Sequence, residues 1–365
     1  MQEDLFGAPP APPAPAPAPA PKPKPAPAAA RPKGVQPAVH GDELRALAAR
    51  LPPTLRLGTS SWSYPGWDGL VWDGSYSEQT LARQGLTAYS QHPLLRSVGI
   101  DRGFYRPLSA SDFARYAAQV PADFRFVVKA PSMVTDALVR SEDGRGREAN
   151  PGFLNGELAA QHFTLPALEG LGVRTGALVF QLSPLPWHLI ERLPEVLERL
   201  RALLAAQPVL AGAPDAVLAV EVRNGEWISP EHAEHFADVL KSTGATYCLG
   251  MHARMPPLSE QLALLRRLWP GPLVCRWNLN PAHGAHGYDQ AERLYAPYDR
   301  IHDPAPEDLA LLARTLAGVC GRGGQNAFVS ISNHAEGSAP LTAQRLAQQV
   351  VDRLASDSGT AQSGA

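Results

Sequence analysis

Between residues 41 and 355 the sequence alternates short runs rich in β-branched and aromatic residues with longer amphipathic segments. This order limits the folds open to the chain, because strands that alternate with helices form a sheet covered by helices. The runs number eight, and we expect each of them to form a strand. They are LRLGT (55–59), LRSVGI (95–100), RFVVKA (125–130), ALVFQ (177–181), VLAVEVR (217–223), TYCLG (246–250), LVCRW (273–277) and FVSIS (328–332).

The amphipathic segments are clearest at 186–206, 229–243, 306–319 and 342–355. Ser229 and Pro230 make a favourable pair of N-cap and first helical residue, so we expect the helix at 229–243 to begin there. Eight strands, each followed by a helix, favour an α/β fold of the TIM-type (β/α)8 barrel class. A doubly wound open sheet would give the same local pattern.

The two ends of the chain differ in composition from this region. Thirteen of the 37 prolines lie within residues 1–40, together with many alanines. Such a segment buries too little apolar surface to offset the entropy of ordering, so we expect a disordered, extended tether. Residues 356–365 are small and polar, and we expect a second disordered tail there. The barrel domain is therefore expected at 41–355.

Composition excludes several classes of protein. Three scattered cysteines cannot form a disulfide framework, and we find neither a signal peptide nor a membrane span, so a cytoplasmic protein is expected. A net charge of -2 gives no indication of nucleic-acid binding. Nucleotide-binding and zinc-protease motifs are missing, and His283 and His286 have no cysteine or acidic neighbour, so we expect no cofactor and no metal.

Polar residues follow one face of the predicted strands near their carboxyl ends. Side chains alternate across a strand, and the outer face of a barrel must be apolar to receive helices. Val220 and Val222 then face outward, while Glu221 and Arg223 face inward. The same alternation directs further residues to this rim, with Asn333 just past the last strand. They are Asp101, Lys129, Gln181, Arg276, Asn278 and His334.

Three cations and two carboxylates meet at this predicted rim. Arginine binds phosphate and carboxylate groups through paired hydrogen bonds, so the mixture suits a small anionic or polyhydroxylated ligand. For any single residue a structural ion pair is an equal alternative. Burial of all five charges at one end of the barrel favours a binding site.

The stretch LGTSSWSYPGWDG (57–69) places three large aromatic residues directly after the first strand. Such residues either form a wall for a sugar or base, or cap the core of the barrel. We expect Trp62 and Tyr64 to form a wall, and the sequence does not decide for Trp67.

Six motifs of this chain resemble those of the YecE-like family, domain of unknown function 72. They are GTSSWSYPGW (58–67), GFYRPLS (103–109), FRFVVKAP (124–131), FQLSP (180–184), AVEVRNGEW (219–227) and SNHAEGSAPLTAQRL (332–346). The resemblance spans nearly all of 55–354 and implies a TIM-type barrel without an established activity. It also implies that further residues lie at the rim, namely Thr59, Trp62, Tyr64, Tyr105 and Asn333.

The chain departs from the pattern of this family at three strands. The resemblance implies glutamate and asparagine where this chain has Gly99 and Asp101, FRH where it has VRN (222–224), and RLHG where it has RWNL (276–279). If a glutamate at position 99 is the catalytic base of the family, Glu221 is the remaining candidate here.

The sequence leaves two classes of function open. The first is a metal-independent hydrolase or lyase in which Glu221, with Asp101, acts as general acid or base. The second is a binding or adaptor protein without turnover. Residues 2–6 (QEDLF) resemble the pentapeptide that binds the bacterial sliding clamp, which predicts the clamp as a partner through Gln2, Leu5 and Phe6. That partner would bring the barrel close to DNA.

Overall fold

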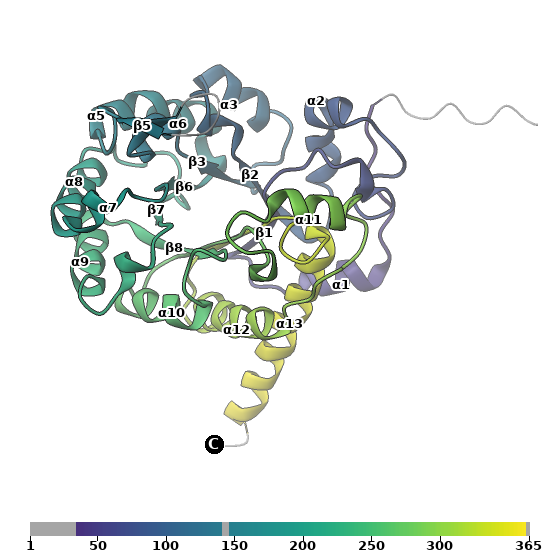
Figure 1. Ribbon diagram of the computed structural model, residues 1–365. Helices are drawn as coiled ribbons and strands as arrows, with labels where there is room; N and C mark the ends of the chain where they lie inside the picture. Colours follow the sequence, from purple (N-terminus) through teal and green to yellow (C-terminus); the bar gives the residue numbers. More distant parts are fainter. Residues whose placement is uncertain (1–33, 141–145, 363–365) are drawn as a thin grey trace, which may run out of the picture. The chain divides into compact units, whose positions relative to one another are not determined.

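A computed structural model describes residues 34–140 and 146–362 and shows a closed barrel of eight parallel strands (Figure 1). The predicted TIM-type barrel is therefore confirmed, and the open sheet is excluded. Around the barrel, the order of the strands is β1, β10, β9, β8, β7, β6, β3, β2. Their bounds are β1 Leu55–Thr59, β2 Leu95–Ile100, β3 Arg125–Lys129, β6 Thr175–Gln181, β7 Val217–Glu221, β8 Thr246–Met251, β9 Leu273–Trp277 and β10 Ala327–Ile331.

Helices surround these strands on the outside of the barrel, except for α11, which lies across one end of it (Figure 1). They are α1 Asp42–Ala49, α2 Glu78–Tyr89, α3 Ala110–Ala117, α4 Ser132–Thr135, α5 Gly156–Ala159, α6 Leu165–Leu171, α7 Trp187–Ile190, α8 Leu193–Ala205, α9 Ala233–Thr243, α10 Leu258–Arg267, α11 Tyr288–Tyr295, α12 Pro306–Leu316 and α13 Ala339–Gln362. An antiparallel pair that we did not predict, β4 Leu138–Arg140 and β5 Gly146–Ala149, lies in the connection after β3. None of the helices in the described part of the chain is long and apolar enough to cross a membrane.

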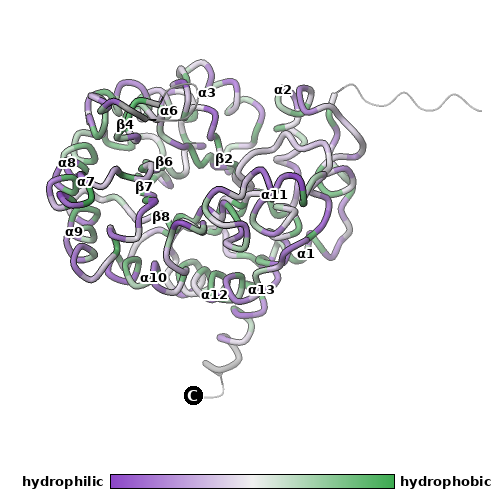
Figure 2. Tube along the Cα trace, in the orientation of Figure 1, coloured by the Kyte–Doolittle hydropathy of each residue, from purple (hydrophilic) through white to green (hydrophobic). Residues whose placement is uncertain are grey.

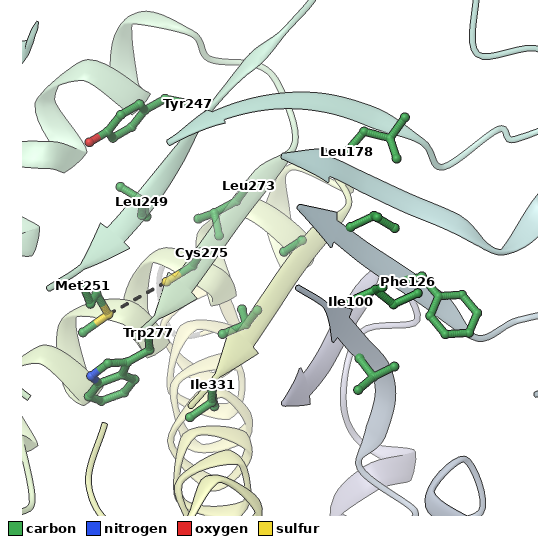
Figure 3. Close-up of a cluster of buried hydrophobic side chains, with 14 of the residues drawn as sticks. Ile100, Phe126, Leu178, Tyr247, Leu249, Met251, Leu273, Cys275, Trp277 and Ile331 are labelled. Atoms are coloured by element: carbon green, nitrogen blue, oxygen red, sulfur yellow. Dashed lines mark hydrogen bonds between the residues drawn. The ribbon is translucent and has the colours of Figure 1, made fainter. Parts of the chain in front are cut away.

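The main core lies between the strands and the helices. Outward-facing side chains from neighbouring strands, such as Ile100, Phe126, Leu249 and Trp277, are buried there (Figure 3). In Figure 2, hydrophobic colouring lies on barrel strands such as β2 and β6, and the helices carry hydrophobic and hydrophilic colours in turn. The alternation of side chains therefore has the predicted direction, with apolar residues outward.

The inside of the barrel is layered along its axis. Its middle is filled by a separate apolar cluster that includes Val127, Val179, Ala219 and Phe328. Below this cluster, at the amino-terminal ends of the strands, the side chain of Asp215 lies 2.6 Å from Arg125 and 3.6 Å from Arg56. The polar residues at the carboxyl ends form a third layer above it.

Replacement of Asp215 by alanine is expected to lower the free energy of unfolding by about 2–4 kcal/mol, because it leaves the buried guanidinium groups of Arg56 and Arg125 without their carboxylate. Denaturant unfolding at pH 7 measures this loss. The matched control is Asp123→Ala, which removes the exposed partner of Arg96 and should change stability by less than about 0.5 kcal/mol. Equal losses in the two variants would contradict the prediction.

Two predicted helices differ from those in the structure. The segment 186–206 forms two helices, because Pro194 has no backbone N–H with which to continue the first. The predicted N-cap at Ser229 is wrong, since α9 begins at Ala233 with His232 as its N-cap. Residues 225–228 instead form a 3-10 turn, η5 Gly225–Ile228, that buries Trp227 and ends at Ser229.

The predicted boundaries of the domain also shift. Val35 and Ala38 are buried, and Pro37 forms a β-bridge with Trp72, so the folded unit begins at Gly34 rather than at residue 41. At the other end α13 continues to Gln362, and the chain keeps its helix beyond residue 355. Residues 1–33, which include the predicted clamp-binding residues Gln2, Leu5 and Phe6, lie outside the described residues.

Candidate functional site

A pocket of about 720 Å³ opens at the carboxyl ends of the barrel strands. This is the end at which barrel enzymes hold their active sites. The pocket is lined by seven of the residues that the sequence predicted, namely Asp101, Tyr105, Lys129, Gln181, Arg223, Arg276 and Asn278. They come from five of the strands or the loops that follow them, so the predicted convergence of polar side chains is present in the structure.

Glycines make room for this polar layer. A Cβ atom at Gly250 on β8 would lie 3.3 Å from a carboxylate oxygen of Glu221. At Gly99 on β2, a Cβ atom would lie 2.7 Å from the backbone oxygen of Ser60, a distance that real Cβ atoms do not adopt. A glutamate cannot replace Gly99 without movement of the loop that follows β1, here called the first rim loop. This gives a physical reason for the departure from the family pattern at this position.

Glu221 lies beneath the floor of the pocket and is fully buried. Its two carboxylate oxygens lie 2.7 Å from Arg223 Nη2 and 2.6 Å from Arg276 Nη1, and Asn278 Nδ2 donates a further hydrogen bond. Burial alone would raise the pKa of Glu221, but the two guanidinium groups outweigh this effect and the pKa is lowered. Glu221 is therefore an ionised anchor for two arginines.

Arg276 joins the floor of the pocket to its wall. Its Nη2 donates to Asp101 Oδ2 at 2.5 Å, and its Nη1 donates to Gln181 as well as to Glu221. Asp101 is more than one-third exposed in the pocket wall. Of the two predicted acid–base residues, only Asp101 faces the pocket directly.

Arg223 has a donor without a partner. Its Nη2 binds Gln181 and Glu221, whereas its Nη1 is buried and makes no hydrogen bond to any described residue. The side chain is only 8% exposed and lines the pocket. A buried, charged donor left unpaired is costly, so the described residues leave the hydrogen-bonding capacity of Arg223 unsatisfied.

Lys129 projects into the pocket from the end of β3. Its ammonium group lies 3.7 Å from the centre of the Phe104 ring, and no carboxylate among the described residues is within ion-pair distance of it. Burial lowers the pKa of Lys129 to about 8. Arg276 and Arg223 add to this effect, while Asp101 and Glu221 oppose it.

One wall of the pocket contains residues that the sequence analysis did not select, among them His252, Arg254 and His286. Burial, with help from Arg223, lowers the pKa of His252 to about 4, so its ring is neutral at pH 7. Its Nδ1 accepts the backbone N–H of Arg254, which leaves the proton on Nε2. Further lining residues that were not predicted to bind a ligand are Ser60, Phe104, Ser183, Pro184, Ala285, Tyr288, Asp289 and Ser332.

Five predicted ligand-binding residues do not line the pocket. Thr59 faces the helices, where its Oγ1 bonds to Tyr89 of α2, because it shares a strand face with Leu55 and Leu57. Trp62 donates to the backbone oxygen of Leu81 and packs against Tyr116, so the expectation that it forms a binding wall is wrong.

Tyr64, Asn333 and His334 lie beside the pocket rather than in its lining. Tyr64 packs on Trp67 and Tyr298, so its expected place in a binding wall is also wrong. Asn333 is buried and accepts hydrogen bonds from Trp67 Nε1 and from the first residue of α13. His334 contacts Ser332 and the ring of Tyr288.

Among the described residues, no group of three His, Cys, Asp or Glu side chains is placed to hold a metal ion. His283 and His286 are engaged separately. His283 bonds to the Tyr295 hydroxyl, and His286 accepts a hydrogen bond from Arg254.

A further groove of about 590 Å³ lies between α10 and α12, lined mainly by apolar side chains such as Leu262 and Trp269. The pocket at the carboxyl ends of the strands, by contrast, is lined by acidic, basic and imidazole side chains, and we therefore take it as the candidate site.

The fold and the site define a TIM-type barrel with a cationic pocket at the carboxyl ends of its strands. The family model described as "Protein of unknown function DUF72" matches residues 56–363, and the chain belongs to this family. A DUF72 family protein from Enterococcus faecalis is similar in structure, with a TM-score of 0.52 at 17% identity over 81% of this chain and 95% of that one.

A DUF72 family protein from Thermotoga maritima has a TM-score of 0.49 at 20% identity, over 81% of this chain and 98% of that one. No curated protein matches the sequence. The likeness to the Enterococcus faecalis protein agrees with the barrel fold, and the function has to be inferred from the site itself.

Proposed function

We propose that the protein is a lyase or hydrolase that acts on a small anionic, sugar-like molecule bound in the barrel-end pocket. The volume of about 720 Å³ is in the range of pockets that bind small molecules. Cationic and polar donors surround it, and Tyr105 and Tyr288 offer aromatic faces at its edge. Aromatic faces of this kind stack on sugar rings.

The observation that carries the proposal is the unpaired Nη1 donor of Arg223. Lys129 and neutral His252 line the same pocket, and neither side chain forms an ion pair with a carboxylate among the described residues. A phosphate or carboxylate group of a ligand would accept hydrogen bonds from these donors.

Glu221 has a different role in this proposal from the one expected from sequence. A general acid or base must reach the proton that it transfers, and Glu221 is covered by Arg223 and Arg276. We therefore assign Glu221 to positioning these arginines. Lys129 and Asp101, which both face the pocket, are the groups able to exchange protons with a ligand.

Inorganic phosphate is the simplest probe of the anion site. In about 100-fold excess over its dissociation constant it should raise the Tm of the full chain by roughly 2–6 °C, because it binds the folded state alone. Arg223→Met should abolish this rise while the chain still folds, since Arg276 continues to neutralise Glu221. Differential scanning fluorimetry measures both effects.

The matched control is Arg192→Met, which removes an exposed arginine paired with Glu195 on the outside of the barrel. This variant should keep the full phosphate-dependent rise. If phosphate leaves the Tm of the wild-type chain unchanged, or if Arg223→Met retains the rise, the anion site is not where we place it.

The alternative is a non-catalytic adaptor tethered to the sliding clamp, which the sequence QEDLF at residues 2–6 favours. A labelled peptide of residues 1–12 should bind purified bacterial clamp, whereas the same peptide with Leu5→Ala and Phe6→Ala should not. The reason is that Leu5 and Phe6 supply the apolar anchors of the motif. Fluorescence anisotropy measures the two affinities, and equal binding of the two peptides would end the adaptor hypothesis.

A further inference from the structure

We propose that Lys129 is a nucleophile that forms an imine with the carbonyl group of an aldehyde or ketone that also carries a phosphate group. This inference rests on the proposed function, because the phosphate would occupy the anion site at Arg223. It adds to that function the substrate class and the residue that bonds to the substrate.

The surroundings of Lys129 favour the neutral amine. An amine reacts with a carbonyl only in its neutral form, and proteins obtain it by desolvation or by placing other cations nearby. Both conditions hold at Lys129. Burial of its ammonium group is the larger effect, and Arg276 and Arg223 line the same pocket. The contact of Nζ with the Phe104 ring works in the opposite direction, because an aromatic face attracts the charged form.

The nearest carboxylates are engaged with other partners. Asp101 accepts a hydrogen bond from Arg276 at 2.5 Å, and Glu221 lies between Arg276 and Arg223. A lysine that serves only as a structural cation would be expected to pair with one of them. Lys129 forms no ion pair within the described residues, although it is half-buried.

The unpaired donor and the amine share one pocket. Arg223 Nη1 has no partner in the described structure, and the side chains of Arg223 and Lys129 line the same cavity. A molecule with a phosphate at one end and a carbonyl a few bonds away could contact both groups. A cavity of about 720 Å³ accommodates a small sugar phosphate of this kind.

The reaction step is balanced without a cofactor. The lone pair of Nζ attacks the carbonyl carbon, a C–N bond forms, and the C=O π bond opens to a carbinolamine. The carbonyl oxygen then leaves as water with both hydrogens of the neutral amine. The product is an imine, which when protonated withdraws electrons from the neighbouring carbon and so permits cleavage of the next bond.

The test traps this imine on the intact chain. The full-length protein is incubated with glyceraldehyde 3-phosphate, reduced with borohydride and digested, and the adduct is located by mass spectrometry. An amine with a pKa of about 8 has a neutral fraction near pH 7 that is more than about a hundredfold larger than that of an ordinary lysine. We expect labelling of Lys129 to exceed that of Lys241, at the end of α9, by at least about tenfold.

Two further arms separate this inference from the proposed function. Glyceraldehyde without phosphate should label Lys129 several-fold more slowly, and inorganic phosphate should compete with the phosphorylated probe. Labelling should rise with pH through about 8. The groups that face Lys129 and set this value are Asp101, Glu221, Arg223 and Arg276.

Lys129→Met should lose the adduct while Lys241 is labelled as before. If Lys129 in the wild-type chain is labelled no faster than Lys241, the imine proposal is wrong, whatever the variant does. A phosphate-dependent rise in Tm would then still support the anion site. If that rise is also missing, both proposals fail.

Discussion

Replacement of Glu221 by glutamine is expected to lower the free energy of unfolding by about 3–5 kcal/mol at pH 7, because the change leaves two buried guanidinium groups with one carboxylate fewer. Glu221 is fully buried, and its oxygens lie 2.7 Å from Arg223 and 2.6 Å from Arg276. Glutamine has nearly the same size and shape as glutamate and its side-chain oxygen still accepts a hydrogen bond. The loss of stability therefore measures the contribution of the negative charge. Guanidinium unfolding of the two proteins measures it.

The dependence of stability on pH should also report the interaction of Glu221 with the two arginines. The pKa of Glu221 is lower in the folded chain than its ordinary value, so its stabilisation is complete above that ordinary value and is lost as the pH falls through the folded pKa. As the pH falls below about 5, the free energy of unfolding should therefore decrease more in the wild-type protein than in Glu221→Gln.

Asp101→Asn is the matched control for this prediction. Asp101 also binds Arg276, but its side chain is more than one-third exposed and solvent screens the pair. The expected loss is about 1 kcal/mol or less. If Glu221→Gln is as stable as the wild type and loses only turnover, the interpretation of Glu221 as a general acid or base regains its support.

The inward direction of the site residues could be predicted from sequence, whereas their depth could not. Alternation along β7 places Glu221 and Arg223 on one face, and both do face inward. Two residues along a strand are also one layer apart along the barrel axis, and the inside of a barrel is filled in layers. Arg223 therefore lines the pocket, while Glu221 lies below it.

The same alternation, applied to β1, would have corrected one error. Thr59 shares a face with Leu55 and Leu57, and that face packs on the helices. Ser60 has the opposite direction and lines the pocket. The sequence pattern alone therefore assigns Ser60 and not Thr59 to the rim, whereas the motif resemblance implied Thr59.

The loops were the least predictable part of the site. His252, Arg254 and Tyr288 lie after strands or on a short helix, where no two-residue period fixes the direction of a side chain. Motif residues can also be structural. Glu336, in the motif that follows β10, is fully buried and accepts hydrogen bonds from Ala305 N, Thr342 and Arg345.

Replacement of Trp67 by alanine should lower the free energy of unfolding by about 3–5 kcal/mol, because it empties a large cavity at the centre of the first rim loop. Trp67 is fully buried between Tyr64, Trp72 and Tyr89, and its Nε1 donates to Asn333 at 3.2 Å. The aromatic stretch after the first strand therefore caps the core at this residue.

One variant separates the contribution of the hydrogen bond from that of packing, and a second serves as the control for an exposed tryptophan. Trp67→Phe keeps most of the packing and removes the hydrogen bond to Asn333, so it should cost less, about 1–2 kcal/mol. Trp187→Ala removes a tryptophan that is 68% exposed on α7 and should change stability by about 0.5 kcal/mol or less. Denaturant unfolding of the three variants decides the matter. A loss in Trp67→Ala no larger than that in Trp187→Ala would mean that the loop is not anchored to the barrel through Trp67.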